Sequence, residues 1–387
     1  MHIPSQIAEN ADALEAIFKD LHAHPELGFE EVRTSAKVVE ALERFGVDEI
    51  HTGLGKTGVV ALIHGTGGGN RRIGLRADMD ALPIQETTGL PYASQNDGVM
   101  HACGHDGHTT MLLGAAQYLA QTRDFSGTAV LVFQPAEEGL GGARRMLAEG
   151  LFDKFPCDEI YGMHNSPGGT LGKISVCKGA AMAGAAFFDI AIKGKGSHAA
   201  APQHSKDALF IAASLATELQ SILSRNVPPL DVCVLSVTQI HSGAAYNVVP
   251  ETAALAGTIR YFKDEIFELA KSRMQAICDG FALAHGVEIT VDARNVFDVL
   301  QNDPELSTAY IEAAADLVGP ENVNDADVPV TGSEDFSDML KVVPGAYVRL
   351  WHGGEASLHN PAFTLDPKVL PLGAALYSKI VETRLAG

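Results

Sequence analysis

Apolar strands and amphipathic helices alternate through the first half of the chain, and few folds accommodate that order. The spacing of apolar residues distinguishes helix from strand. In an amphipathic helix apolar residues recur every three or four positions, whereas in a buried strand they form a continuous run. The predicted helices cover 5–20, 31–45 and 107–122, and the predicted strands cover 59–65, 71–78 and 127–134. This alternation predicts an α/β domain whose mixed, mostly parallel sheet carries helices on both faces.

Residues 185–293 follow a different order, which is strand, helix, strand, strand, helix, strand. That order is the ferredoxin-like α+β plan. Strands are predicted at 186–194, 231–240, 252–262 and 286–292, and helices at 207–225 and 264–285. The α/β pattern then resumes with a helix at 305–317, a strand at 344–351 and a helix at 370–384. We therefore expect a discontinuous domain of 1–184 and 294–387 with a smaller domain, 185–293, inserted in it.

The charge balance excludes two classes of partner. The chain has 28 Lys and Arg residues and 48 Asp and Glu residues, which gives a net charge of −20. Such a surface repels phosphate backbones and anionic lipids, so we expect neither a nucleic-acid nor a membrane partner. The first residues lack the pattern of a secretion signal, and the cysteines lack paired spacing. These features predict a soluble, cytoplasmic protein.

The segment HACGHDGH (101–108) precedes the apolar helix and is rich in metal-binding side chains. Cys103 and His105 can converge on one ion from a bent loop, because a thiolate and an imidazole suit zinc and similar metals. An alternative is a helix-capping loop with Asp106 as the cap.

Other polar residues follow apolar strands, where side chains of a parallel sheet converge. Glu137 and Glu138 follow the strand at 127–134, and neighbouring side chains in an extended chain point opposite ways. One carboxylate could then ligate a metal while the other reaches a water. His164 ends a further apolar segment, and His359 follows the last apolar strand. Alternatives are a solvated acidic turn for the pair and a structural role for a lone histidine, but a set this large suggests two ions with a bridging ligand.

The ordered motifs of the chain resemble the metal-dependent aminoacylase/carboxypeptidase family. The resemblance is to the branch of hippurate hydrolases, N-acyl-amino-acid amidohydrolases and plant auxin-conjugate hydrolases. It rests on LHAHPELGFEE (21–31), LRADMDALPI (75–84), MHACGHDGHT (100–109), FQPAEEG (133–139), GMHN (162–165), GKGSHAAAP (194–202), HSGAAYNVVP (241–250), GTIR (257–260), TGSEDFS (331–337) and LHNPAF (358–363). It implies a two-metal amidase with a lid domain that also dimerises.

The resemblance also implies roles for individual residues. Glu137 would be the general base, and the metal ligands would be Cys103, His105, Glu138, His164 and His359. The broader family begins its ligand set with a histidine where this chain has Asp78. Asp78 and Asp80 are therefore expected to support the ligands, and the metal would be zinc, manganese or another divalent ion.

The lid would contribute His198 to catalysis, and Asn247 and Arg260 to substrate binding. Asp335 would buttress the site or cap a helix, and His22 and His24 are expected to be structural. The expected activity is hydrolysis of N-acyl-L-amino acids by a homodimer or higher oligomer. Three alternatives stay open: an aminopeptidase or dipeptidase of the same fold, a hydrolase with Cys103 as nucleophile and His105 as its partner, and a metal-binding protein without catalysis.

Overall fold

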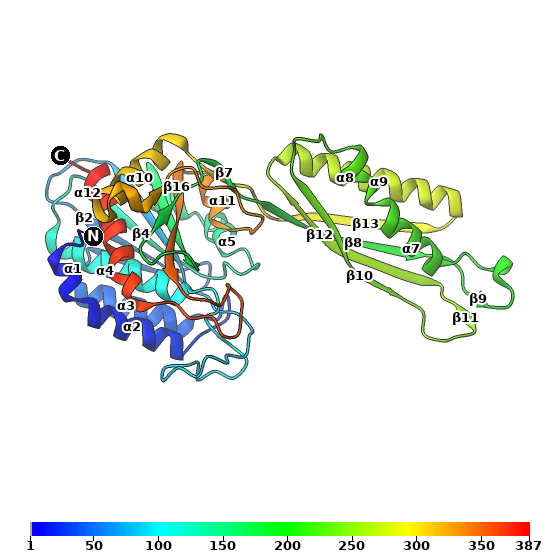
Figure 1. Ribbon diagram of the computed structural model, residues 1–387, viewed down its shortest axis with the longest axis horizontal. Coiled ribbons are helices and arrows are strands. Elements are labelled where there is room, and N and C mark those ends of the chain that lie inside the picture. The colour runs from blue at the N-terminus through cyan, green and yellow to red at the C-terminus, as the bar shows by residue number, and fades with distance from the viewer. Residues whose placement is uncertain (1) are drawn as a thin grey trace. The chain divides into compact units, whose positions relative to one another are not determined.

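The computed structural model describes residues 2–387, which form two compact units (Figure 1). The first comprises the chain up to Ala181 together with Gln301–Pro329 and Asp335–Gly387. The second comprises Met182–Leu300 and Val330–Glu334. Among residues 2–387, no helix combines the length and the apolar character needed to cross a bilayer.

The first unit is built on a mixed sheet with the strand order β1-β2-β4-β3-β5-β16-β6-β15. The central strands β4, β3, β5 and β16 are parallel. Strand β2 pairs antiparallel with both β1 and β4, and β6 pairs antiparallel with β16. This confirms the predicted mostly parallel sheet. The strands are β1 (Glu49–Leu54), β2 (Gly58–His64), β3 (Arg72–Asp78), β4 (Thr128–Gln134), β5 (Glu159–Pro167), β6 (Ile174–Ser175), β15 (Val323–Asn324) and β16 (Gly345–Gly353).

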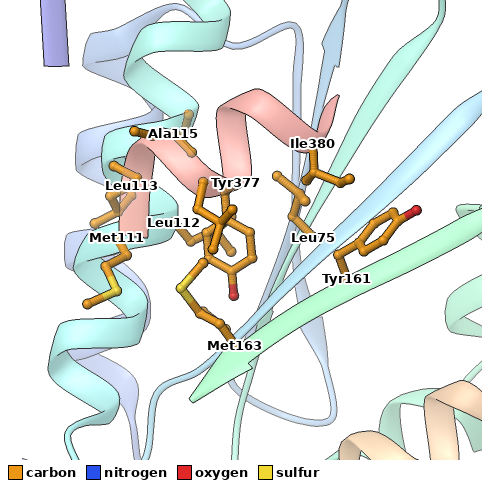
Figure 2. Packing of buried hydrophobic residues seen from close by; sticks show 14 of the residues in the cluster. Leu75, Met111, Leu112, Leu113, Ala115, Tyr161, Met163, Tyr377 and Ile380 are labelled. Carbon is orange, nitrogen blue, oxygen red and sulfur yellow. The ribbon is translucent and has the colours of Figure 1, made fainter. Parts of the chain in front are cut away.

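Helices cover both faces of this sheet. Figure 2 shows Leu75 of β3 and Met163 of β5 against α4 and α12, where Tyr377 packs among them. Gly162, the neighbour of Met163, faces the other way, since a Cβ there would lie 3.3 Å from the Phe336 ring of α11. The helices are α1 (Ser5–Glu9), α2 (Ala11–Ala23), α3 (Val32–Phe45), α4 (His105–Thr122), α5 (Gly142–Ala148), α6 (Leu151–Lys154), α10 (Pro304–Val318), α11 (Phe336–Leu340) and α12 (Leu370–Arg384).

Local sequence sets several helix ends. Asp303 caps α10 by accepting hydrogen bonds from two backbone N–H groups, with Pro304 in the first turn, and Gly46 ends α3 with φ 74°. The helix predicted at 5–20 is instead two helices, because the Asn10 side chain bonds the Gln6 carbonyl and interrupts the ladder.

The second unit has the predicted ferredoxin-like order. Its antiparallel sheet runs β10-β12-β8-β13, and alternate residues of β8 are buried under the helices while the others are exposed. The helix predicted at 207–225 is divided, because the Gln220 N–H bonds the carbonyl of Thr217, three residues back. The elements are β8 (Gly184–Lys193), β9 (Ser197–His198), α7 (Ala208–Glu218), α8 (Ser221–Arg225), β10 (Cys233–Ser242), β11 (Val248–Val249), β12 (Thr252–Tyr261), α9 (Asp264–His285) and β13 (Glu288–Phe297).

Candidate metal centre

The carboxyl ends of strands β3, β4 and β5 meet at one edge of the first unit's sheet. The parallel register sets Asp78 of β3 beside Gln134 of β4, and Arg76 of β3 beside Gly162 of β5. His164, two residues further along β5, therefore lies level with Asp78. The register alone brings polar side chains from distant parts of the sequence to this edge.

One group of donor atoms joins this edge to the start of α4. The ligand atoms of Cys103, His105 and His164 lie within 4.8 Å of one another, and Cys103 Sγ is 3.5 Å from His164 Nε2. Gly104 has φ 85°, and a Cβ there would lie 2.3 Å from the amide nitrogen of Asn165. Glycine is therefore required at the bend that directs both neighbouring side chains to one point.

A second group shares Cys103 and adds Glu138 and His359. Their ligand atoms also lie within 4.8 Å of one another, and His359 Nε2 is 3.3 Å from Glu138 Oε1. His359 is a left-handed residue with φ 63°, and its N–H donates to the Ala102 carbonyl over 2.8 Å. The loop after β16 is thus tied to the loop that carries Cys103. The sequence-predicted ligands all belong to these two groups.

The fit of these residues to a metal follows from an atom that lacks a hydrogen-bond partner. His105 Nε2 is buried without a hydrogen-bond partner, and it lies 3.9 Å from Glu138 Oε1, which His359 Nε2 approaches to 3.3 Å. Buried polar atoms are rarely left unpaired in native proteins unless they bind something. Sulfur, imidazole nitrogen and carboxylate oxygen together are the donors that zinc and related divalent ions accept.

The surroundings of Cys103 and His359 favour the protonated forms of both side chains. Burial raises the pKa of the Cys103 thiol. Hydrogen bonds with Cys103 and Glu138 raise the pKa of His359 to about 10. Metal binding needs a thiolate and a neutral imidazole, so metal uptake by these residues must release protons. The raised thiol pKa also opposes a free thiolate nucleophile.

Asp80 links one ligand of each group. Its Oδ1 is 3.2 Å from His105 Nδ1, and its Oδ2 accepts the Glu138 N–H over 2.9 Å. The first contact turns His105 Nε2 toward the site, which is the usual task of a carboxylate behind a metal-binding histidine. One carboxylate therefore orients an imidazole and a backbone turn at the same time.

Asp78 reaches the site through His108, a residue that the sequence reasoning did not select. Asp78 Oδ1 is 2.6 Å from His108 Nδ1, and His108 Nε2 accepts the Asn165 N–H over 2.9 Å. Nδ1 therefore carries the proton. Asn165 Nδ2 donates to the Cys103 carbonyl over 2.5 Å. His108 is the third histidine of the segment 101–108 and lies in the first turn of α4. Its position in the sequence does not distinguish it from an ordinary helix residue.

Asp335 buttresses the sheet edge and not the ligands themselves. It accepts hydrogen bonds from Arg76, from Gln134 and from the Ala143 N–H. Although Asp335 precedes α11, its side chain makes no cap hydrogen bond. Arg76 also donates to Asp78 over 2.7 Å, so Asp335 is three contacts away from His108. Of the two roles expected for Asp335, the contacts favour the buttress.

Glu137 and Glu138 lie in a tight turn, which differs from the extended chain that we expected. Ala136, directly before them, has φ 55°, and the Gly139 N–H bonds the Glu137 carbonyl over 2.6 Å. The turn still separates the two carboxylates. Glu138 joins the group of Cys103, while a carboxylate oxygen of buried Glu137 lies within 4.8 Å of ligand atoms of His105 and Glu138.

Three sequence-predicted residues lie in the second unit. His198 and Asn247 are exposed neighbours, since the Ala199 N–H bonds the Asn247 carbonyl and His198 pairs with Val248 between β9 and β11. Arg260 of β12 is half-buried and bonds Thr258. Their roles toward a substrate stay predictions.

Comparison with known proteins decides the family. The sequence model of peptidase family M20/M25/M40 matches residues 74–383. The chain belongs to this family. The match covers the carboxyl end of β3, the start of α4, the Glu137 turn, β5 and the loop of His359, so every residue of both donor groups lies inside the M20 match.

Relatives of this M20 chain place it in the expected branch. A hippurate hydrolase of Campylobacter jejuni is 40% identical over 98% of each chain, and an N-acetylcysteine deacetylase of Bacillus subtilis is 40% identical over 94% of each. A crystal structure of a dinuclear metal-binding M20 peptidase of Bacillus subtilis superposes with a TM-score of 0.85 at 36% identity, covering 98% of this chain and 99% of that one. The resemblance drawn from the motifs is confirmed.

Proposed function

We propose that this chain is a metal-dependent amidohydrolase that cleaves N-acyl-L-amino acids to a carboxylic acid and a free amino acid. One arrangement carries the proposal. Two donor groups share Cys103, and a further buried carboxylate, that of Glu137, lies beside them. A protein that only binds metal needs no such carboxylate. The names of the Campylobacter and Bacillus relatives both denote cleavage of an N-acyl amino acid.

The donor groups would hold two divalent ions, zinc in the first instance, with manganese or another divalent ion as the alternative. The side chains of Cys103, His105, His164, Glu138 and His359 would hold these ions. When bound, such ions lower the pKa of a water toward about 7 and polarise a carbonyl. The buried His105 Nε2, which has no hydrogen-bond partner, and its 3.9 Å separation from Glu138 Oε1 support this assignment.

Glu137 would move the proton. An amide resists water because its carbonyl is weakly electrophilic and its nitrogen leaves poorly, so a base must accept the water's proton and return it to the nitrogen. Glu137 is buried, and its carboxylate stands beside ligand atoms without being needed by either donor group. It is the carboxylate best placed for that transfer.

The first unit would be the catalytic domain and the second a lid that recognises the substrate. His198 would stabilise the developing oxyanion, and Asn247 and Arg260 would bind the substrate carboxylate. His198 and Asn247 are exposed, and because His198 Nδ1 accepts the Ala200 N–H over 3.0 Å, its Nε2 is the ring nitrogen available to a ligand.

Two rival activities are separable from this proposal. An aminopeptidase or dipeptidase of the same fold would require a free α-amino group on its substrate. A hydrolase with Cys103 as nucleophile would need no metal, but burial raises the pKa of this thiol and works against it.

A substrate panel with metal removal tests the proposal. We expect kcat/KM for N-acetyl, N-benzoyl or longer N-acyl amino acids to exceed that for free dipeptides by about 10-fold or more, because a buried charged amine is poorly accepted where a neutral amide fits. EDTA should abolish activity, and zinc or manganese should restore it. A preference for free amines, or full activity in protein shown by analysis to contain no metal, would refute the proposal.

We also propose that the chain acts in the cytoplasm as a homodimer or larger oligomer in which His198 serves the partner's site. A monomer should then lose roughly 100-fold or more in kcat, the usual effect of removing one oxyanion donor. Activity measured across a dilution series, with size followed by sedimentation, checks this, and His198→Ala should match the monomer's loss without dissociating. Undiminished activity in a sedimentation-verified monomer would contradict it, and cell fractionation checks the location.

A further inference from the structure

The turn that carries Glu137 and Glu138 contains a strained residue. Ala136 has φ 55°, which places a residue with a Cβ in the left-handed region. For a non-glycine residue this conformation costs on the order of 1–2 kcal/mol. Contacts from the surrounding structure must therefore hold Ala136 in place.

Several hydrogen bonds hold the backbone of this turn. The Ala136 carbonyl accepts the Gly142 N–H over 3.0 Å, and the Glu138 N–H donates to Asp80 Oδ2 over 2.9 Å. Gly142 has no room for a side chain, since a Cβ there would lie 1.6 Å from the Pro135 oxygen. A further contact is made by the Ala136 N–H, which donates over 2.8 Å to Oε1 of Glu31. A side chain far away in the sequence thus anchors the residue directly before the proposed base.

Both carboxylate oxygens of Glu31 accept hydrogen bonds. It is fully buried, and its second oxygen accepts the Thr57 hydroxyl over 2.6 Å. Gly28, in the same motif, packs on the turn, because a Cβ there would lie 3.0 Å from the Ala136 Cα. The segment therefore touches Ala136 through a close backbone approach and through a hydrogen bond. Burying a carboxylate is costly, so its placement against one strained N–H calls for a role.

We propose that Glu31 is a positioning residue for hydrolysis: by holding Ala136 left-handed, it fixes the turn that aims Glu137 at the attacking water and Glu138 at the metal. This inference rests on the proposed function for the tasks of those two carboxylates. Without the acceptor, the Ala136 N–H is left buried and unpaired, and the turn relaxes toward ordinary backbone angles. A displacement of about 1 Å at a reacting group costs on the order of 100-fold in rate.

The test compares Glu31→Leu with Glu31→Gln. Leucine fills the space without an acceptor, whereas the glutamine carbonyl still accepts the Ala136 N–H. We expect Glu31→Leu to lower kcat by about 10- to 100-fold with KM within about twofold, and to weaken zinc or manganese binding to the metal-free protein about 10-fold. Glu31→Gln should keep kcat and metal affinity within about threefold of wild type. Chelator competition gives the affinity independently of activity, and Glu31→Ala replaces the leucine variant should that variant not fold.

Glu159 supplies the matched control. It is a buried carboxylate at the opposite, amino end of β5, where it pairs with Arg384. Glu159→Ala should lose stability while keeping kcat and metal affinity. If Glu31→Leu behaves like Glu159→Ala, or if Glu31→Gln loses as much as Glu31→Leu, the positioning role is wrong. If the wild type hydrolyses no N-acyl amino acid, the proposed function fails, while the metal affinities still decide the role of Glu31.

Discussion

Glu137→Gln is expected to lower kcat for an N-acyl amino acid by roughly 1,000-fold, within the range that general-base catalysis contributes. The amide has nearly the shape of the carboxylate, but it cannot accept the proton of the attacking water. Because the two side chains have nearly the same volume, the substitution should leave the fold unchanged, although Glu137 is buried in the turn after β4. KM should change little, because the lost interaction belongs to the transition state.

Metal content separates this effect from damage to the site. Glu137→Gln should bind zinc or manganese with the stoichiometry of the wild type, whereas Glu138→Gln, one residue on, should lose metal as well as activity. Kinetics combined with metal analysis of both variants checks this. Equal metal loss in the two variants, or a Glu137→Gln enzyme within about tenfold of wild type, would rule out Glu137 as the base.

The broad architecture could be predicted because it depends on local patterns. Continuous apolar strands between helices predicted the parallel sheet, and the order of elements in 185–293 predicted the second sheet. Breaks inside helices could not be predicted, because they depend on single contacts. The Asn10 side chain ends α1, and a hydrogen bond from the Gln220 N–H to the Thr217 carbonyl, three residues back instead of four, separates α7 from α8, although apolar spacing runs through both.

The ligand groups were predictable for a related reason. Donor residues at strand ends, such as His164, converge wherever parallel strands share an edge. The supporting contacts are less predictable, because they join residues whose sequence neighbourhoods are ordinary. Arg76 and Asp335 are 259 positions apart, and Glu31 and Ala136 are 105 apart. His108 was missed since only its partners, Asp78 and Asn165, distinguish it from a helix residue.

The segment 21–31 also contacts the start of α4 through His22. This side chain lies between two buried carboxylates, those of Asp106 and Glu86. His22 Nδ1 is 2.7 Å from Asp106 and Nε2 is 3.3 Å from Glu86, with the three side chains at most 3% exposed. Burial alone would lower the pKa of His22, but the hydrogen bonds to Asp106 and Glu86 outweigh it and raise the pKa to about 10. A protonated His22 thus ties the residue after His105 to the loop of Glu86. The structural role expected for His22 is consistent with these contacts.

His22→Gln is expected to destabilise the protein by about 3–5 kcal/mol at pH 6, because it leaves two buried carboxylates without their cation. In the unfolded chain the pKa of His22 is near the ordinary histidine value of 6.5, so the folded state holds an extra proton between that pH and about 10. The stabilisation is therefore complete below about pH 6.5 and falls as pH rises, by at most about 1.4 kcal/mol per pH unit.

Unfolding free energies from pH 6 to 9.5, at a fixed metal concentration, should show the gap between wild type and His22→Gln narrowing as pH rises. His24→Gln is the matched control in the same helix end, since His24 is half-buried and its ring bonds the Asp20 carbonyl. It should cost about 1 kcal/mol, without the same narrowing, because it removes one ordinary hydrogen bond. A gap for His22→Gln that is constant with pH, or a His22 that titrates near 6.5 by NMR, would show that His22 does not act as a buried cation between Asp106 and Glu86.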